Sequence, residues 1–156
     1  MAPREATIVI RRPLRTVFPF VADAENLHRS RSDVIAVNRT SGAPTAAGAT
    51  YRQVVRIAWR ELDLTLENTE HEPGRRLAFT ARGSDRVTVR TEFSFRVIET
   101  EHTLVSVAID GDARLLSPLA RQLRKRELEA LRGLKRTLEA HPPDPHEPGA
   151  AYPPDP

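Results

Sequence analysis

The chain has 156 residues, the size of one folded domain, and its 39% hydrophobic and 29% charged content is typical of a soluble globular protein. It contains no cysteine, which excludes disulfides, thiolate metal sites and a cysteine nucleophile. No apolar run approaches the roughly 20 residues that span a bilayer, and residues 1–12 do not resemble a signal peptide. The expected location is therefore cytoplasmic, with no transmembrane segment.

The formal net charge is +3, and almost all of the basic residues are arginine. An arginine-rich surface could indicate an anionic partner, such as nucleic acid or a phospholipid surface. The arginines are interleaved with acidic residues instead of collected in runs, which favours an ordinary solvated surface encoded by a GC-rich gene. Composition therefore disfavours nucleic acid as a partner, and it leaves the oligomeric state open.

The N-terminal part of the chain predicts a strand followed by two short helices. Residues 6–11 are rich in β-branched side chains and form the first strand. Pro13 suits the first position of a helix, and Pro19 inside that helix should shorten or kink it. Asp23 is a good N-cap for the next helical turn. Residues 29–33 are polar and predict a loop.

Six further segments predict strands, because hydrophobic and polar residues alternate in most of them. They are residues 34–40, 50–58, 61–71, 76–81, 86–97 and 103–110. Turn-forming pairs such as Pro73-Gly74 separate them. Alternation over consecutive strands predicts an antiparallel sheet with one wet face and one dry face.

Residues 117–140 predict one long amphipathic helix, and a serine and a proline at its start suit the N-cap and the first helical position. Its leucines recur at three- and four-residue spacing and form one apolar stripe. Glu127 falls in the middle of that stripe, between Leu123 and Leu131. A long helix with an apolar face needs an apolar surface to lie on, and the dry face of the sheet supplies one.

The end of the chain differs in composition from the rest. Residues 141–156 are rich in proline and poor in apolar side chains, so they predict an extended, disordered tail. The chain is thus predicted to be one domain, residues 1–140, followed by this tail.

Several local motifs resemble one known superfamily. Residues 10–29 hold a strand that ends at a proline, a Val-Phe helix and an Asp-x-x-Asn turn, and residues 48–52, 72–77 and 134–139 are also similar. Together they resemble the START-like or SRPBCC superfamily, most closely its polyketide cyclase/dehydrase and lipid-transport type, over about residues 6–140.

The resemblance implies the helix-grip fold, an α+β fold with two short helices after the first strand. In it, a curved antiparallel sheet of about six to seven strands wraps around a long C-terminal helix. The fold class expected for this chain is therefore α+β, of the helix-grip (START-like) type.

In this superfamily the function lies in a cavity between the helix and the sheet. The resemblance implies binding of a hydrophobic or amphipathic small molecule, such as a lipid, a quinone or a polyketide-like compound, without a cofactor. Two alternatives stay open: a polyketide cyclase or dehydratase that uses the same cavity, and an RNA- or ribosome-associated interaction module. Ser30 stands about where the family often has a tryptophan, so the pocket mouth is expected to be more polar or more open.

Strand parity and the helical stripe indicate which side chains line this cavity. The expected ligand-binding residues are Tyr51, Gln53, Val55, Leu64, Phe79, Val89, Thr91, Phe93, Leu123, Glu127 and Leu131. The polar members also have structural interpretations. Tyr51 can be a core aromatic, Gln53 can lie at a wet sheet edge, and Thr91 is an ordinary strand residue.

Glu127 is the candidate catalytic residue. A carboxylate buried without a partner is costly, and burial would raise its pKa. A raised pKa suits a general acid or base in dehydration or ring closure. The alternative is that Glu127 pairs with an arginine or turns to the edge of the helix.

No familiar catalytic motif occurs in the sequence. It lacks the nucleophile elbow of hydrolases, the zinc motif of metalloproteases and the glycine-rich loops of nucleotide-binding proteins. The five histidines show no metal-ligand spacing, so no metal site is predicted, and His71 at a strand end is expected to be solvated.

Overall fold

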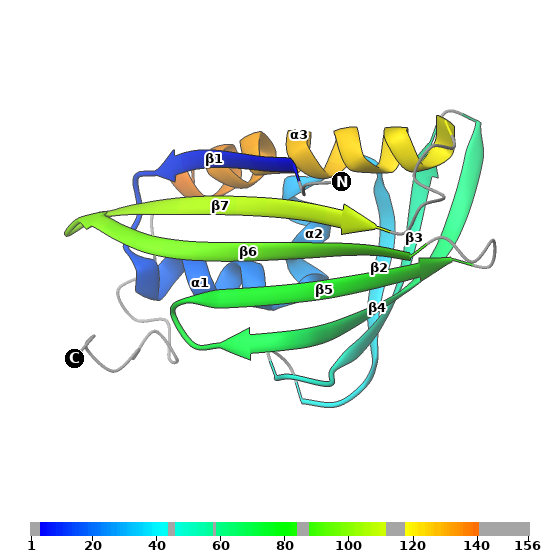
Figure 1. Ribbon diagram of the computed structural model, residues 1–156, viewed down its shortest axis with the longest axis horizontal. Helices are drawn as coiled ribbons and strands as arrows, with labels where there is room; N and C mark the ends of the chain where they lie inside the picture. The colour runs from blue at the N-terminus through cyan, green and yellow to red at the C-terminus, as the bar shows by residue number, and fades with distance from the viewer. Residues whose placement is uncertain (1–3, 44–45, 58, 84–87, 112–117, 141–156) are drawn as a thin grey trace.

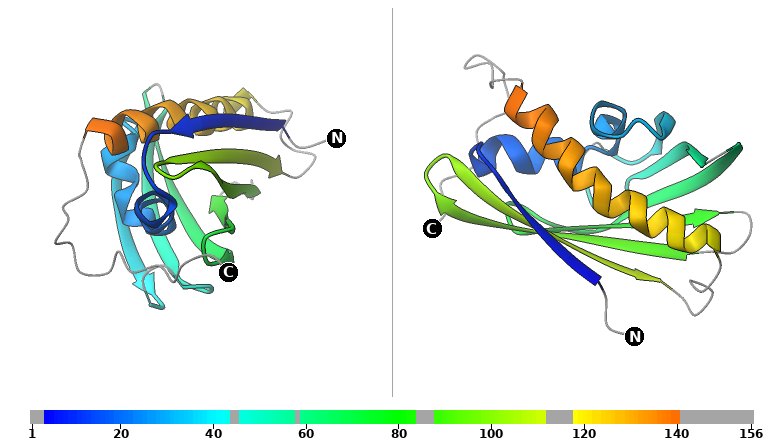
Figure 2. Two further views of the ribbon diagram at one scale, coloured as in Figure 1. Left: turned by 90° about the vertical axis from the view of Figure 1, so that its left-hand side faces the viewer. Right: turned by 90° about the horizontal axis from the view of Figure 1, so that it is seen from above.

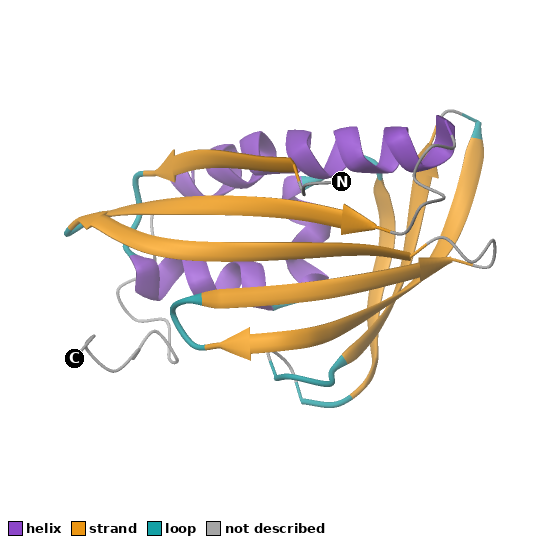
Figure 3. Cartoon of the chain, viewed as in Figure 1, coloured by secondary structure: helices purple, strands orange, loops and turns teal. Residues whose placement is uncertain are grey.

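The structure, a computed structural model, describes residues 4–43, 46–57, 59–83, 88–111 and 118–140. These residues form one seven-stranded antiparallel sheet with helices packed against it (Figure 1). The predicted α+β class is confirmed, including two short helices after the first strand and one long C-terminal helix (Figure 3). The proline-rich segment predicted as a tail lies outside the described residues.

Every predicted strand and helix is present, within a few residues of its predicted ends. The strands are β1 (Arg4–Ile10), β2 (Val34–Ser41), β3 (Thr50–Ile57), β4 (Arg60–Glu72), β5 (Arg76–Gly83), β6 (Thr88–Glu99) and β7 (His102–Gly111). The helices are α1 (Leu14–Ala22), the 3-10 turn η1 (Ala24–Asn26), α2 (Leu27–Ser30) and α3 (Pro118–Ala140).

The strands lie in the order β1-β7-β6-β5-β4-β3-β2, and each neighbouring pair is antiparallel. Register shifts interrupt the β2–β3, β4–β5 and β6–β7 pairs. Such bulges bend strands and increase their twist. The sheet therefore curls, and the helices lie within its concave side (Figure 2).

The segment after β1 starts and stops its helices through local backbone chemistry. Pro13 is the N-cap of α1, with an extended ψ of 153°, so the helix begins one residue later than predicted. Pro19 lies inside α1, which is short as expected, at nine residues. Asp23 caps the next turn as predicted, because its side chain accepts a hydrogen bond from the backbone N–H of Glu25 at 3.0 Å.

The prediction of a loop at residues 29–33 is partly wrong. Helix α2 continues to Ser30, and Arg31 is only 5% exposed. The Arg31 guanidinium donates to both carboxylate oxygens of Asp33, with Nη2 and Oδ2 2.7 Å apart. A polar run predicts solvent exposure, but here two opposite charges neutralise each other locally and can be buried together.

Helices cover both free edges of the sheet, which are β1 and β2. On β2, the backbone N–H of Val37 donates to Nε2 of His28 in α2 at 2.8 Å. On β1, Nζ of Lys135 in α3 donates to the carbonyl of Val9 at 2.7 Å. These contacts occupy polar backbone groups that would otherwise be open to pairing with another chain.

An aromatic contact fixes α1 against the sheet. The ring of Phe18 meets Phe95 of β6 edge-on at 4.9 Å between centroids, and it meets His71 of β4 at 5.4 Å. His71 is thus half-buried, and the prediction that it is solvated is wrong. Burial lowers the pKa of His71 and favours its neutral form.

The C-terminal end of α3 is fixed to the segment after β1 through Glu139. Its Oε1 accepts hydrogen bonds from the backbone N–H of Arg11 at 2.9 Å and from Nζ of Lys135 at 2.7 Å. Partial burial by itself raises the pKa of the Glu139 carboxyl, but the hydrogen bonds from Lys135 and Arg11 outweigh it and lower the pKa to about 2. The charged form of Glu139 therefore stabilises the fold.

Acid is expected to weaken this attachment. Because the pKa of Glu139 is lower in the folded chain than its ordinary value of 4.5, its stabilisation is present above pH 4.5 and is lost as the pH falls toward about 2. Glu139→Gln should lower the free energy of unfolding at pH 7 by about 1–2 kcal/mol. It should also flatten the rise of stability between about pH 2 and pH 4.5, measured by urea unfolding.

Glu129→Gln is the matched control, because Glu129 is an exposed carboxylate on the same helix. Its unfolding free energy should follow the wild-type pH profile. Identical profiles for Glu139→Gln and wild type would contradict the assignment.

Candidate functional site

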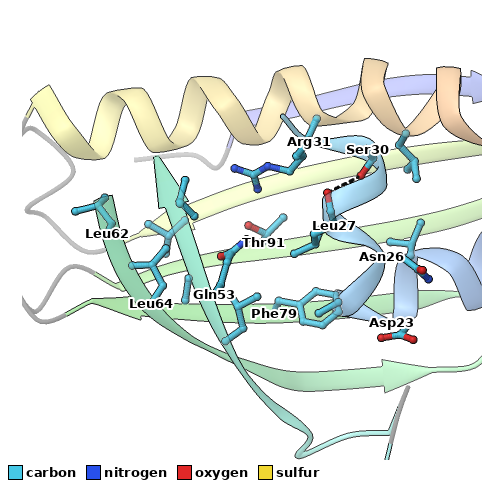
Figure 4. A pocket seen from close by; sticks show the side chains of 18 of the residues that line it. Asp23, Asn26, Leu27, Ser30, Arg31, Gln53, Leu62, Leu64, Phe79 and Thr91 are labelled. Atoms are coloured by element: carbon cyan, nitrogen blue, oxygen red, sulfur yellow. Dashed lines mark hydrogen bonds between the residues drawn. The ribbon is translucent and has the colours of Figure 1, made fainter. Parts of the chain in front are cut away.

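A cavity of about 270 Å³ lies between the concave face of the sheet and the helices. Figure 4 shows it from close by, with α3 along one side and the strands along the other. Its lining comprises Phe20, Val21, Asp23, Ala24, Asn26, Leu27, Ser30, Arg31, Gln53, Val55, Arg60, Glu61, Leu62, Asp63, Leu64, Leu66, Phe79, Ala81, Gly83, Val89, Thr91, Phe93, Ala130, Leu131 and Leu134.

The alternation of the strands explains how these side chains reach the cavity. Residues two apart on a strand point to the same face of the sheet. Gln53 of β3 pairs with Leu64 of β4, and Val55 pairs with Leu62, so each pair presents both side chains to the concave side. Cross-strand register therefore assembles the wall from strands that are distant in the sequence.

Most of the residues predicted to line the cavity do so. They are Gln53, Val55, Leu64, Phe79, Val89, Thr91, Phe93 and Leu131. Tyr51 is fully buried in the hydrophobic core and is not among the lining residues. Leu123 and Glu127 belong to α3, but their side chains lie outside the described residues, so the catalytic role of Glu127 stays a prediction.

The sequence analysis missed the part of the wall that comes from η1 and α2. Asn26, Leu27 and Arg31 line the cavity, and so does Ser30, the residue that stands where the superfamily often has a tryptophan. The Asp-x-x-Asn turn is the sequence feature that could have indicated this wall. Nδ2 of Asn26 donates to the carbonyl of Phe20 at 3.0 Å and holds η1 against the end of α1.

Helices α2 and α3 are in direct backbone contact beside the cavity. A Cβ atom on Gly133 of α3 would lie only 2.0 Å from the carbonyl oxygen of Ser30, so only glycine fits there. One turn further along α3, Oγ1 of Thr137 donates to the carbonyl of Arg29 at 2.8 Å. These two contacts set how closely α2 approaches α3, and with it the position of the α2 side of the cavity.

The charged lining residues are Asp23, Arg31, Arg60, Glu61 and Asp63. Arg60 is exposed at the start of β4, and the half-buried Asp23 caps η1 by accepting a hydrogen bond from the backbone N–H of Glu25. Glu61 and Asp63, on the exposed face of the β3–β4 hairpin, pair with Arg56 at 3.3 Å and Arg52 at 2.6 Å. Arg31 is buried and paired with Asp33, so its charge is balanced within the protein. Among the described lining residues, the inner wall is thus apolar apart from this balanced pair, Asp23 and a few uncharged polar side chains.

Gln53 is the most deeply buried of these uncharged polar groups. The residue is 3% exposed, and its Nε2 makes no hydrogen bond to any of the described residues. Thr91 of β6, at 7% exposed, also faces the cavity. The arrangement is that of a small-molecule site, in which apolar walls supply affinity and a few polar groups fix orientation.

The described part of the chain contains no group of three or more His, Cys, Asp or Glu side chains that could hold a metal ion. Within the same part, none of the helices combines the length and the apolar character needed to cross a membrane.

Residues 1–139 match the family described as polyketide cyclase / dehydrase and lipid transport. The chain belongs to this family. No curated protein matches the chain significantly. The family match covers the whole of the described fold, from β1 to the last turn of α3.

Several solved structures share this fold. The protein TTHA0849 from Thermus thermophilus has a TM-score of 0.71 at 17% identity, over 88% of this chain and 97% of that one. A START superfamily protein from Mycobacterium smegmatis has a TM-score of 0.71 at 15% identity, over 90% and 99% of the two chains.

A third structure, the di-domain ARO/CYC BexL from the BE-7585A biosynthetic pathway, has a TM-score of 0.72 at 17% identity. The match covers 89% of this chain and 47% of BexL, as expected for one of two domains. At these identities the likenesses concern the fold alone. They confirm the predicted helix-grip fold of the START-like superfamily.

Gly133→Ala tests the contact between α2 and α3. In a helix interior this change ordinarily stabilises by about 1 kcal/mol. Here the new methyl group would overlap a backbone carbonyl that no side-chain rotation can relieve, so we expect destabilisation by about 2 kcal/mol or more, measured by urea unfolding.

Arg136→Ala serves as the control, because Arg136 is an exposed residue on the same helix. It should change the unfolding free energy by no more than about 0.5 kcal/mol. A stabilised Gly133→Ala protein would show that the helices are not held in contact at Ser30.

Proposed function

We propose that this protein binds a hydrophobic or amphipathic small molecule, such as a lipid, a quinone or a polyketide-like compound, in the cavity between the sheet and α3. The observation that carries the proposal is the volume of the cavity. Protein interiors rarely contain voids larger than a water molecule. A cavity of about 270 Å³ is instead close to the lower limit of roughly 300 Å³ for small-molecule sites.

The chemistry of the wall supports the same proposal. Most of its lining residues are apolar, and they are mainly leucine, valine and phenylalanine, including Val55, Leu64 and Phe79. An apolar wall of this kind binds an apolar ligand because binding removes the surface of the wall and the surface of the ligand from water. Membership of a family described by polyketide cyclisation and lipid transport agrees with an apolar ligand of moderate size.

The described lining favours binding over catalysis. Acid–base chemistry requires proton-transfer groups that converge on the substrate. Three carboxylates belong to the described lining. Glu61 and Asp63 lie on the exposed hairpin, each beside an arginine, and Asp23 caps η1 by accepting a hydrogen bond from the backbone N–H of Glu25. Catalysis at Glu127, as in a polyketide cyclase or dehydratase, stays a prediction. The proposal that the cavity binds a small molecule does not depend on it.

Surface charge favours a small molecule over nucleic acid as the ligand. On the outer face of the sheet, Arg76 and Arg90 both pair with Glu92, and Arg90 also pairs with Glu70. Proteins bind nucleic acid largely because their basic side chains neutralise phosphates and release the counterions. Arg76 and Arg90 would first have to give up their carboxylate partners to do so.

Filling the cavity should abolish binding. We predict that the wild-type chain binds the neutral fluorescent probe N-phenyl-1-naphthylamine at one site, and that Leu64→Trp weakens this binding at least about tenfold, because the indole occupies the ligand's space. The measurement is a fluorescence titration, with native mass spectrometry for the stoichiometry.

Val97→Trp is the control, because Val97 lies on β6 with 47% of its surface exposed and away from the cavity lining. It adds the same indole without filling the cavity and should leave the affinity unchanged. The proposal fails if the wild-type chain does not bind the probe, or if a folded Leu64→Trp protein binds it equally well.

A further inference from the structure

Trp59 is the most exposed large hydrophobic side chain among the described residues. It lies in the turn between β3 and β4, and 93% of its surface is exposed. It is also the only tryptophan in the chain. A single apolar side chain on a protein surface is ordinary, but tryptophan is highly buried on average. The position of Trp59 in the molecule therefore decides whether its exposure has a purpose.

Trp59 lies where the cavity reaches the protein surface. The next residue, Arg60, is exposed and also lines the cavity, and so are Glu61 and Asp63. Between them, Leu62 continues the apolar wall from the hairpin into the cavity (Figure 4). Trp59 itself is not among the lining residues. The indole thus borders the opening of the cavity without occupying it.

The hairpin that carries Trp59 has an excess of positive charge. Its other two arginines are already neutralised, because Arg52 pairs with Asp63 and Arg56 pairs with Glu61. Arg60, beside the indole, forms no ion pair with any of the described residues. The one arginine next to Trp59 is therefore available to an anionic partner outside the chain.

The beginning of α3 adds positive charge at the same end of the molecule. Figures 1 and 2 both place the N-terminal turns of α3, drawn in yellow, at the end where the β3–β4 hairpin turns. Residues 118–126 of this helix include four basic residues and no acidic residue, and Lys125 among them is exposed. The cavity opening is therefore bordered by basic segments on two sides.

The opposite end of the molecule has exposed apolar side chains of a different setting. Val97 and Ile98, on the β6–β7 hairpin, are 47% and 46% exposed. Residues 96–102 hold two glutamates and one arginine, so this hairpin carries no excess of positive charge. Apolar exposure and free positive charge thus coincide at the Trp59 end, beside the cavity opening.

We propose that the β3–β4 hairpin docks this protein onto the surface of anionic phospholipid membranes, with the indole of Trp59 among the headgroups and Arg60 against the lipid phosphates. Tryptophan favours the interface between membrane and water, because its ring is apolar and its N–H is polar. Arginine pairs well with phosphate oxygens, and anionic lipids attract basic side chains near the surface.

Docking in this orientation turns the cavity opening toward the bilayer. An apolar ligand then passes between the membrane and the cavity without crossing water, where it is poorly soluble. This exchange rests on the proposed function of the cavity as a small-molecule site. The membrane contact itself depends on the hairpin and not on any ligand.

The size of the hairpin favours a membrane over a protein as the partner. A stable protein–protein interface buries about 800 Å² on each side. One tryptophan side chain contributes about 150–250 Å², and the charged side chains beside it are typical of the rim of an interface and not of its core. Membrane binding needs less, because shallow insertion of an apolar side chain and attraction between opposite charges act together.

The test follows the fluorescence of Trp59, which reports on the hairpin alone because the chain has no other tryptophan. The full chain is mixed with vesicles of phosphatidylcholine, or of phosphatidylcholine and phosphatidylglycerol. With the anionic vesicles we expect emission to shift to shorter wavelength, and brominated lipids to quench it. Binding measured by vesicle flotation should weaken as the salt concentration rises, because salt screens the charges.

Two substitutions separate the contributions of the hairpin, and flotation measures both. Trp59→Ala should weaken binding to anionic vesicles about tenfold, because the indole no longer leaves water. Arg60→Gln should weaken it about fivefold, and only when the vesicles are anionic. Both residues are exposed, so both variants should fold.

Ile98→Ala and Arg96→Gln are the matched controls. They remove an exposed apolar side chain and an exposed arginine from the opposite end of the molecule. Neither should alter vesicle binding.

Ligand transfer gives a second readout. N-phenyl-1-naphthylamine preloaded in anionic vesicles should pass to the wild-type chain faster than to Trp59→Ala. The affinity of the two proteins for the probe in solution should be equal, because Trp59 does not line the cavity.

The outcomes separate docking from the proposed function. The inference is overturned if the wild-type chain does not bind anionic vesicles, if it binds neutral vesicles equally well, or if Trp59→Ala binds as tightly as wild type. Self-association that Trp59→Ala abolishes, without vesicle binding, would assign Trp59 to a contact between copies and also overturn it. Vesicle binding that requires Trp59 supports docking even if the naphthylamine probe does not bind, a result that overturns the cavity function alone.

Discussion

The hollow in this protein depends on the backbone contact between α2 and α3 at Gly133. The carbonyl of Ser30 occupies the space that a Cβ atom would need, so the two helices approach at a separation set by glycine. Thr137 adds a hydrogen bond to the same short helix. With α2 held there, its side chains close one side of the cavity while the curved sheet forms the other. The cavity is thus a consequence of where two backbones meet.

Polar groups inside the fold divide by whether the protein satisfies them. Arg31 and Asp33 neutralise each other, and Glu139 is satisfied by Lys135 and Arg11. The charges of these pairs are thus balanced locally within the fold. The buried amide groups of Gln53 and Asn68 differ from these, because Nε2 of Gln53 and both amide atoms of Asn68 make no hydrogen bond to any of the described residues.

Local patterns predicted much of the fold and part of the site. Alternation placed Gln53, Val89 and Thr91 on the concave face, and all three line the cavity. The same rule placed Tyr51 there, yet it is buried in the core, because parity gives the face of a sheet and not the position along it. His71 was missed for another reason. The register shift between Asn68 and Glu70 reverses the alternation, so His71 turns toward the helices.

The sequence by itself determined the strand order along the chain, the face that each strand buries and the amphipathic helix that covers them. These properties are local, because side-chain direction repeats every two residues in a strand and every 3.6 residues in a helix. Only the tertiary structure decided which inward side chains border empty space. That depends on the separation of elements far apart in the sequence, such as Ser30 and Gly133, and no local periodicity encodes a distance of that kind.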